Sequence, residues 1–405
     1  MIGLSLSTLS SPMALLARFA VVSDLHIALP HTIWDSPTRF HLVEVSIPAF
    51  EQILDHLARV DIDFLLLPGD LVQHGERENH QWLVQRLGQL PYPVYVVPGN
   101  HDVVKHGGCD RTLSLDEFVH LYQDFGYTDP TQPYYHHKLL DGLHLIGLNS
   151  NGFEPNGDPF YTGWLDPEQL DWLDQQLDQL AQLPNQPLTL VMLHHNALEH
   201  LPRQSHSRMG QRYMVKNATD LTERLQAANV PLMFTGHLHV QDVAQANRLY
   251  EVTTGSLVSY PHPYRICELA TTDADHRLDI TSHRIEAVPD WPTLQATSQQ
   301  WMAEHSFPFM MKLLTSKPLY LPPAEAEKIA PVMQNFWARV AGGDALFDFP
   351  ELPPKLQRYF HTFSATAPDG QPQCIDNNAT LWLKRERQPY KTALQSETPA
   401  TSGPG

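Results

Sequence analysis

The sequence predicts an α/β (α+β) fold: a four-layer sandwich of two mixed β-sheets flanked by helices, with a C-terminal, mostly helical appendage. Three observations support this prediction. Short apolar runs alternate with amphipathic stretches over the first 285 residues, the pattern changes to period two after His239, and helical periodicity interrupted by prolines begins near residue 289. Strand–helix repetition followed by hairpins is typical of sheets that are covered by helices.

The elements follow in order from these patterns. Apolar runs predict buried strands, and apolar residues at helical spacing predict the helices between them. Strands are expected at 18–22, 64–67, 94–97, 188–193 and 232–234, and helices at 41–60, 79–90, 166–182 and 219–228. The period-two segments at 240–246, 249–253, 265–269 and 278–284 predict an antiparallel meander.

The same patterns divide the chain into four parts. Residues 1–17 are expected to be a loose leader, 18–288 the main domain, 289–387 the helical appendage and 388–405 a disordered tail of small polar residues. The aromatic residues of the appendage are most simply its own core, and a cap over the functional site or a dimer seam is the alternative.

Composition excludes several classes of protein. With 27 Lys and Arg against 45 Asp and Glu, the formal charge is 27 − 45 = −18. Such a chain repels nucleic acid and anionic membranes, so nucleic-acid partners and a DNA-processing nuclease are disfavoured. There is no apolar run of the ~20 residues that a membrane span needs and no recognisable signal peptide, so we expect a cytoplasmic protein without a membrane partner. The sequence gives no indication of oligomeric state.

Five short polar motifs follow five predicted strands. They are Asp24-Leu25-His26, Gly69-Asp70, Gly99-Asn100-His101-Asp102, His194-His195 and Gly236-His237-Leu238-His239. Side chains beyond the carboxyl ends of strands meet at one edge of an α/β sheet. Alternation along an extended chain would turn Asp24 and His26 to one side, and likewise His237 and His239. Carboxylate, amide and imidazole ligands suit two cations of the Mn, Fe or Zn type, which a shared carboxylate can bridge at ~3.5–4 Å.

This ordered set of motifs resembles the calcineurin-like metallophosphoesterase superfamily, and within it the branch that includes class III cyclic-nucleotide phosphodiesterases. Two further segments are similar to that branch: Gly163 to Leu173 before the middle histidines, and Thr254 to Arg265 in the closing strands. The resemblance covers about residues 18–285, which would make 18–288 a metallophosphoesterase domain. Each motif alone is weak, whereas five in this order are specific.

The resemblance implies a role for each motif residue. The first metal would be held by Asp24, His26 and His239, the bridge would be Asp70, and the second metal would be held by Asn100, His194 and His237. His101 would protonate the leaving oxygen or grip the phosphate, and Asp102 would orient His101, with a helix N-cap as the alternative for Asp102. His195 is a candidate substrate contact, and packing beside its neighbour is the alternative.

The expected activity is hydrolysis of phosphoesters that depends on two metals. We predict a phosphodiesterase for small diesters, with cyclic nucleotides among the candidate substrates, in which a hydroxide bridging the metals attacks phosphorus and a histidine acid assists the leaving group. A phosphomonoesterase or nucleotide pyrophosphatase would use the same metal site. A non-catalytic binding scaffold is the remaining alternative. Such a protein would be expected to have lost metal ligands or the acid histidine, and none of these residues is missing here. Arg203, Arg208 and Arg212, in the long loop after His195, are expected to be solvated, with contact to a phosphate or a distal substrate group as the alternative.

Overall fold

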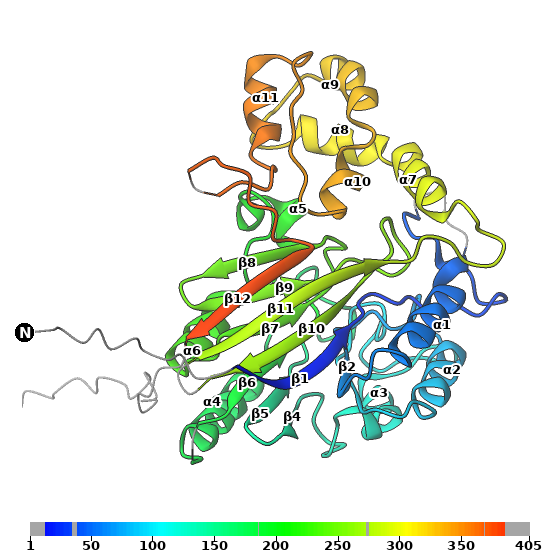
Figure 1. Ribbon diagram of the computed structural model, residues 1–405. Coiled ribbons are helices and arrows are strands. Elements are labelled where there is room, and N and C mark those ends of the chain that lie inside the picture. The colour runs from blue at the N-terminus through cyan, green and yellow to red at the C-terminus, as the bar shows by residue number, and fades with distance from the viewer. Residues whose placement is uncertain (1–12, 35–38, 185, 273–274, 368, 385–405) are drawn as a thin grey trace, which may run out of the picture.

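The computed structural model describes residues 13–34, 39–184, 186–272, 275–367 and 369–384. Within these ranges the protein forms two six-stranded sheets (Figure 1). The first sheet has the order β12 (Asn378–Lys384), β11 (Asp275–Arg284), β10 (Pro263–Thr271), β1 (Ala14–Val21), β2 (Phe64–Leu67) and β3 (Val94–Val96). The second has the order β4 (Tyr135–Leu140), β5 (Leu143–Gly147), β6 (Leu188–Met192), β7 (Leu232–Thr235), β9 (Leu249–Thr253) and β8 (Asp242–Ala246).

Both sheets are mixed. In the first, β1, β2 and β3 run parallel, and β10, β11 and β12 continue the sheet in antiparallel fashion. In the second, β5, β6, β7 and β9 are parallel, and β4 and β8 are antiparallel edge strands. The strands that precede the five polar motifs therefore belong to the parallel part of one sheet or the other.

Helices cover the sheets and form the C-terminal region. The main domain contains α1 (Ser46–Leu57), α2 (Arg77–Leu87), α3 (Leu115–Leu121), α4 (Pro167–Ala181), α5 (Arg208–Gln211) and α6 (Ala218–Ala227), with 3-10 turns at η1 (Val43–Val45), η2 (Gln123–Phe125) and η3 (Gln204–His206). The C-terminal helices are α7 (Leu294–His305), α8 (Phe307–Thr315), α9 (Pro323–Ile329), η4 (Ala330–Met333), α10 (Phe336–Ala341) and α11 (Pro354–His361). We call residues 294–361 the cap, which stands above the sheets in Figure 1.

The main core lies between the two sheets. Phe19 of β1 stacks on Phe64 of β2 at 4.8 Å between ring centroids and meets Phe234 of β7 edge-on at 5.6 Å. A second apolar cluster, which includes Leu173 of α4 and Leu221 of α6, covers the other face of the second sheet. This arrangement of helices around two packed sheets confirms the predicted fold class.

The predicted meander is wrong in one respect. The hairpin of β8 and β9 extends the second sheet, because β9 pairs in parallel with β7, whereas the hairpin of β10 and β11 joins the first sheet through β1. The four strands form two antiparallel hairpins, but they extend two sheets rather than one.

The ends of the chain also differ from the sequence-based expectation. Strand β1 begins at Ala14, within the segment expected to be a loose leader, and β12 returns from the helical appendage to pair with β11. The expected disordered tail at 388–405 lies outside the described residues, as do residues 1–12. None of the helices in the described ranges is both long enough and apolar enough to cross a membrane.

Candidate metal centre

The loops that follow β1, β2, β3, β6 and β7 meet at one place. Three groups of side chains there have ligand atoms within 4.8 Å of one another. The first group is Asp24, His26, Asp70 and His239, the second is Asp70, His194 and His237, and the third is His26, His41 and His239. The predicted convergence of the five motifs is therefore present in the structure, and both sheets contribute to it.

Backbone conformation in these loops is not extended. Asp24, His26 and Asp70 have φ values of 52°, 43° and 51°, and His237 and His239 have 64° and 58°. Positive φ is uncommon for residues other than glycine and is a feature of strained functional loops. The expectation that extended-chain alternation aligns these side chains is therefore wrong, because left-handed turns do so instead.

Glycines allow the loops to approach one another closely. A Cβ atom on Gly69, which has φ of 92°, would lie 2.5 Å from Nδ1 of His194. A Cβ on Gly99 would overlap the Asp70 carboxylate, and one on Gly236 would overlap Asp24. Only glycine leaves room for these ligand side chains at the strand ends.

The first group places nitrogen and oxygen lone pairs around a common point. Oδ1 of Asp24 lies 3.0 Å from Nε2 of His239, and Nε2 of His239 lies 3.5 Å from Nε2 of His26. Burial alone would raise the pKa of Asp24, but His239 outweighs burial and holds this pKa below its usual value. Burial lowers the pKa of His26 to about 3, so the imidazole is neutral and its nitrogen can act as a ligand.

The second group has the same character. Nδ1 of His194 lies 2.8 Å from the Pro68 carbonyl oxygen, and Nε2 of His237 lies 3.3 Å from the Arg212 carbonyl oxygen. A carbonyl oxygen only accepts, so these outer nitrogens carry the protons. The inner nitrogens, Nε2 of His194 and Nδ1 of His237, then face each other at 3.1 Å. Two opposed lone pairs repel unless a cation or a proton lies between them.

Asp70 lies between the two groups. Its Oδ2 is 3.7 Å from Nε2 of His26 and 3.3 Å from Nε2 of His194. Burial would raise the pKa of Asp70, but His194 and His101 outweigh burial and hold it well below the usual value. Conversely, burial lowers the pKa of His194, but Asp70 outweighs burial and raises it to about 9. The site therefore attracts positive charge to the place where Asp70 would bridge two cations.

Asn100 and His101 lie on the loop after β3. The buried Oδ1 of Asn100 has no hydrogen-bond partner among the described residues, which suits a ligand atom better than a structural amide. The backbone N–H of His101 donates to Oδ1 of Asp70 at 2.8 Å, and Nδ1 of His101 lies 2.6 Å from the Gln73 carbonyl oxygen. That contact orients the imidazole, leaving Nε2 as its free nitrogen at the cavity wall.

Asp102 does not contact the His101 side chain. Its buried carboxylate accepts hydrogen bonds from the backbone N–H groups of Val72 at 3.0 Å and Gly99 at 2.8 Å. The expected orienting of His101 by Asp102 has no side-chain contact to support it, and the Gln73 carbonyl is the group that contacts Nδ1 of His101. The N-cap alternative is not seen either, because turns rather than a helix follow. Asp102 instead braces the two loops that carry Asp70 and Asn100.

His195 is also placed differently from the expectation. Its Nδ1 lies 2.8 Å from the Ser150 hydroxyl, its ring packs 4.3 Å from that of His237, and the residue is 5% exposed. Gly163 leaves room for this ring, because a Cβ there would approach it within 2.7 Å. His195 supports His237 from behind and does not line the cavity, so the substrate-contact prediction is not supported and the packing alternative is.

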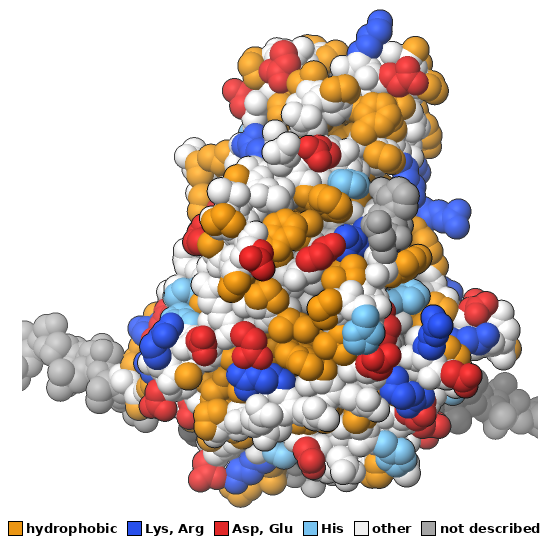
Figure 2. All heavy atoms as spheres, turned by 90° about the vertical axis from the view of Figure 1, so that its right-hand side faces the viewer, with side chains coloured by type: hydrophobic (Ala, Val, Ile, Leu, Met, Phe, Trp, Pro, Cys, Tyr) orange, Lys and Arg blue, Asp and Glu red, His pale blue; other side chains and the backbone are white. Residues whose placement is uncertain are grey.

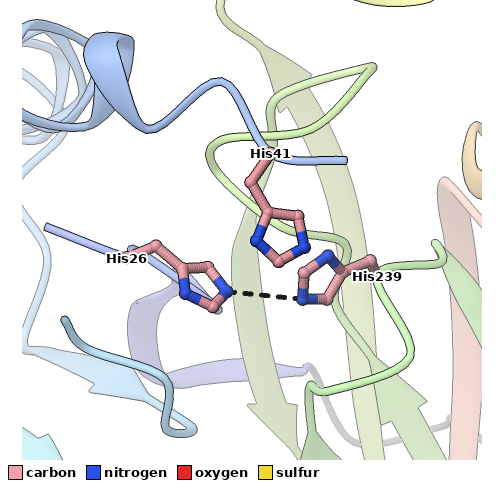
Figure 3. Close-up of side chains that lie close together, drawn as sticks. All are labelled: His26, His41 and His239. Atoms are coloured by element: carbon pink, nitrogen blue, oxygen red, sulfur yellow. Dashed lines mark hydrogen bonds between the residues drawn. The ribbon is translucent and has the colours of Figure 1, made fainter. Parts of the chain in front are cut away.

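His41 was not among the residues singled out from the sequence. Its ring lies 4.6 Å from those of His26 and His239, and its ligand nitrogen lies within 4.8 Å of theirs. Figure 3 shows His41 standing over the gap between the two other imidazoles. A lone histidine in the loop before α1 carries no motif, so only the fold brings it to the site.

A cavity of about 550 Å³ opens above these groups. Asp70, His101, His237 and His239 line its base, and Arg212 lines its rim. Arg212 is exposed, its guanidinium lies 5.4 Å from the centre of the Tyr213 ring, and no carboxylate pairs with it among the described residues. Arg212 is therefore exposed to solvent, as predicted. It also lines the cavity above the site.

Comparisons with known proteins agree with this geometry. The family model described as calcineurin-like phosphoesterase matches residues 17–241. A 3',5'-cyclic-nucleotide phosphodiesterase of Nostoc sp. is 28% identical over 193 residues, covering 47% of this chain and 61% of that protein. The cyclic adenosine monophosphate phosphodiesterase CpdA of Haemophilus influenzae is 28% identical over 239 residues, covering 58% of this chain and 76% of that protein.

A solved structure shares the fold at much lower identity. A dimetal phosphatase from Danio rerio superposes with a TM-score of 0.50 and 13% identity, covering 67% of this chain and 97% of that one. The chain spans less than two thirds of the length of the Nostoc relative. Because the family match covers more than half of its length, the chain belongs to the calcineurin-like phosphoesterase family.

Proposed function

We propose that the protein is a metal-dependent phosphodiesterase that acts on small diesters. The observation that carries this proposal is the buried Asp70 carboxylate between two sets of imidazole nitrogens that lie 3.1 Å and 3.5 Å apart. The relatives named phosphodiesterases, at about 28% identity, support the diester preference. A cytoplasmic location stays a prediction.

The donor set suits two cations of the Mn, Fe or Zn type. The first would be held by Asp24, His26, Asp70 and His239, and the second by Asp70, Asn100, His194 and His237. When bound, the two cations would neutralise the phosphate oxygens and activate a water molecule for attack. The carbonyls of Pro68 and Arg212 fix the tautomers of His194 and His237 so that their inner nitrogens are available.

His101 is the proposed proton donor. Its Nδ1 is held by the Gln73 carbonyl, so Nε2 can hold a proton at the cavity wall and deliver it to the leaving oxygen. The overall reaction consumes one water and one diester: the bond between phosphorus and the leaving oxygen breaks, and a monoester and an alcohol form. Arg212, exposed at the rim, is placed to pair with a non-bridging phosphate oxygen.

The test uses the purified full chain, with Mn²⁺ added, on bis-p-nitrophenyl phosphate and p-nitrophenyl phosphate. We expect faster hydrolysis of the diester. Asp70→Asn should lose both metal and activity, because one carboxylate serves both groups. His101→Ala should keep its metal content and lose at least ~100-fold in rate. His206→Ala, which alters an exposed imidazole, is the matched control.

The outcomes separate the alternatives. Preference for the monoester would favour a phosphomonoesterase with the same centre. Absence of metal uptake together with wild-type behaviour of Asp70→Asn would favour a binding scaffold. Full activity in His101→Ala would refute the proton-donor role.

A further inference from the structure

The cap supplies one wall of the cavity above the metal centre. Met302 of α7, Phe309 of α8 and Trp337 of α10 line the cavity, opposite the polar base. These residues belong to the segment for which an independent core was the simplest expectation. The cavity is therefore two-sided, with acidic and imidazole groups below and apolar side chains above.

The apolar wall is a defined arrangement of aromatic rings. The rings of Phe309 and Trp337 lie 4.8 Å apart at an angle of 48°. Trp337 and Phe40, from the loop before α1, pack around buried Met302. Phe309 and Trp337 are only partly buried, so they keep apolar surface available in a site whose other side is charged. Figure 2 shows apolar side chains extending from the cap onto the body on this side of the molecule, with histidines among them.

Contacts with the metal-centre loops hold this wall in place. Leu238, between His237 and His239, is 1% exposed and belongs to the apolar cluster of the cap. The backbone N–H of Gln241 donates to the Ala341 carbonyl at 3.1 Å, and Nε1 of Trp301 donates to the Arg39 carbonyl at 3.2 Å. A wall that is fixed before the substrate arrives costs little to order on binding.

A second groove shares His74 and His101 with the cavity. It is lined by His74, Asn100, His101 and Lys105, and it contains none of the cap residues. A leaving oxygen protonated by His101 would depart toward this groove. The ester group that stays on phosphorus would then face the aromatic wall.

We propose that the wall formed by Met302, Phe309 and Trp337 binds the retained ester group and selects diesters in which that group is a planar aromatic ring. This inference rests on the proposed function and specifies its substrate class. An aromatic ring gains from apolar burial and from stacking or edge contacts with Phe309 and Trp337. A cavity of about 550 Å³ with cap residues in its lining has the size of small-ligand sites, which suits a small diester.

The experiment compares two esters with the same leaving group, phenyl p-nitrophenyl phosphate and methyl p-nitrophenyl phosphate, on the metal-loaded full chain. We expect a higher kcat/KM for the phenyl ester. Trp337→Ala should lower the phenyl-to-methyl ratio about tenfold, chiefly through KM for the phenyl ester. Trp382→Ala is the matched control, because Trp382 is 52% exposed on β12 and does not line the cavity.

A binding measurement without turnover provides an independent readout. Calorimetry with phenylphosphonate and methylphosphonate should show tighter binding of the phenyl compound, and Trp337→Ala should reduce the difference. Phe309→Leu, which preserves most of the volume, decides the question if Trp337→Ala does not fold.

The two proposals can fail separately. If the wild type hydrolyses neither ester, the proposed function fails. If it hydrolyses both with a ratio near one, or with a ratio that the cap variants leave unchanged, the aromatic selection is wrong while the phosphodiesterase assignment stands.

Discussion

Replacing Leu238 by alanine tests whether the cap supports the metal centre. Leu238 lies between His237 and His239, yet its side chain is buried in the cap cluster and is 1% exposed. Truncating a leucine in a packed core costs about 2–5 kcal/mol, because apolar contacts are lost and a cavity remains. The same change frees the backbone turn that sets the direction of both imidazoles, so metal affinity should fall about tenfold or more, as it does when outer supports of ligands are removed.

A matched variant separates these two effects. Leu356 of α11 is also 1% exposed and lies in the same apolar cluster, but it is not on a ligand loop. Urea titration should show a similar loss of stability in Leu238→Ala and Leu356→Ala. Equilibrium dialysis with Mn²⁺ should show weaker binding only in Leu238→Ala.

Two results would refute this reasoning. One is an equal metal affinity in the two variants at a similar loss of stability, which would mean that the cap stabilises the protein without supporting the site. The other is wild-type stability in Leu238→Ala, which would mean that the cap does not pack on this loop.

Three further predictions follow from the structure. Burial lowers the pKa of His200, but Glu251 and Asp242 outweigh burial and raise it to about 10. The ion pairs of protonated His200 add roughly a few kcal/mol to the free energy of unfolding. This contribution is complete below the unfolded pKa of about 6.5 and is lost as pH rises through about 10. The urea midpoint of the wild type should therefore fall between these pH values, and the midpoint of His200→Gln should change less. Asp102→Ala leaves two buried N–H groups without an acceptor, at ~1–3 kcal/mol each, and should lower the urea midpoint more than Asp102→Asn. His41→Ala should weaken one of two Mn²⁺ binding steps by about tenfold in calorimetry, since its nitrogen adjoins the first group.

Each has a result that would contradict it. Parallel pH curves for wild type and His200→Gln would show that the ion pair is not formed. Equal stability of the two Asp102 variants would show that Asp102 does not stabilise the loops that carry Asp70 and Asn100. Unchanged metal binding in His41→Ala would show that His41 lines the cavity without contributing to metal binding.

Much of the fold could be predicted because its local signals agree with its tertiary structure. The strand at 64–67 matches β2, and the helix expected at 166–182 contains α4, which Asp166 caps by accepting from the Gln169 N–H at 2.8 Å. Strand β12 also alternates, with Leu381 and Leu383 buried, but it lies within the segment 289–387 that is predicted to be a helical appendage. The hairpin of β4 and β5 has an Asp141-Gly142 turn that could have revealed it.

The candidate site was predictable only in part. Motifs at strand ends pointed to the residues that the structure brings together, since the ends of parallel strands must share an edge. The residues around them could not be found this way. His41 comes from a loop without a motif, so only the fold brings it to the site. Arg212 and Trp337 were noted in the sequence only as secondary alternatives, since a long connection and a distant helix have no spacing that ties them to the motifs. The conformation of the ligands themselves, with positive φ, depends on neighbouring loops rather than on local preference.

The metal centre is also the junction of three parts of the molecule. Asp24, His26 and Asp70 follow strands of the first sheet, whereas His194 and His237 follow strands of the second, and Leu238 enters the cap. Cations bound there would hold the two sheets together as well as act on phosphate. A ligand that binds only the folded state adds about 2.7 kcal/mol of stability at 100 times its Kd, so metal loading should stabilise both sheets at once. If Asp24 and His237 are ligands as proposed, cation binding offsets the cost of the strained turns that position them.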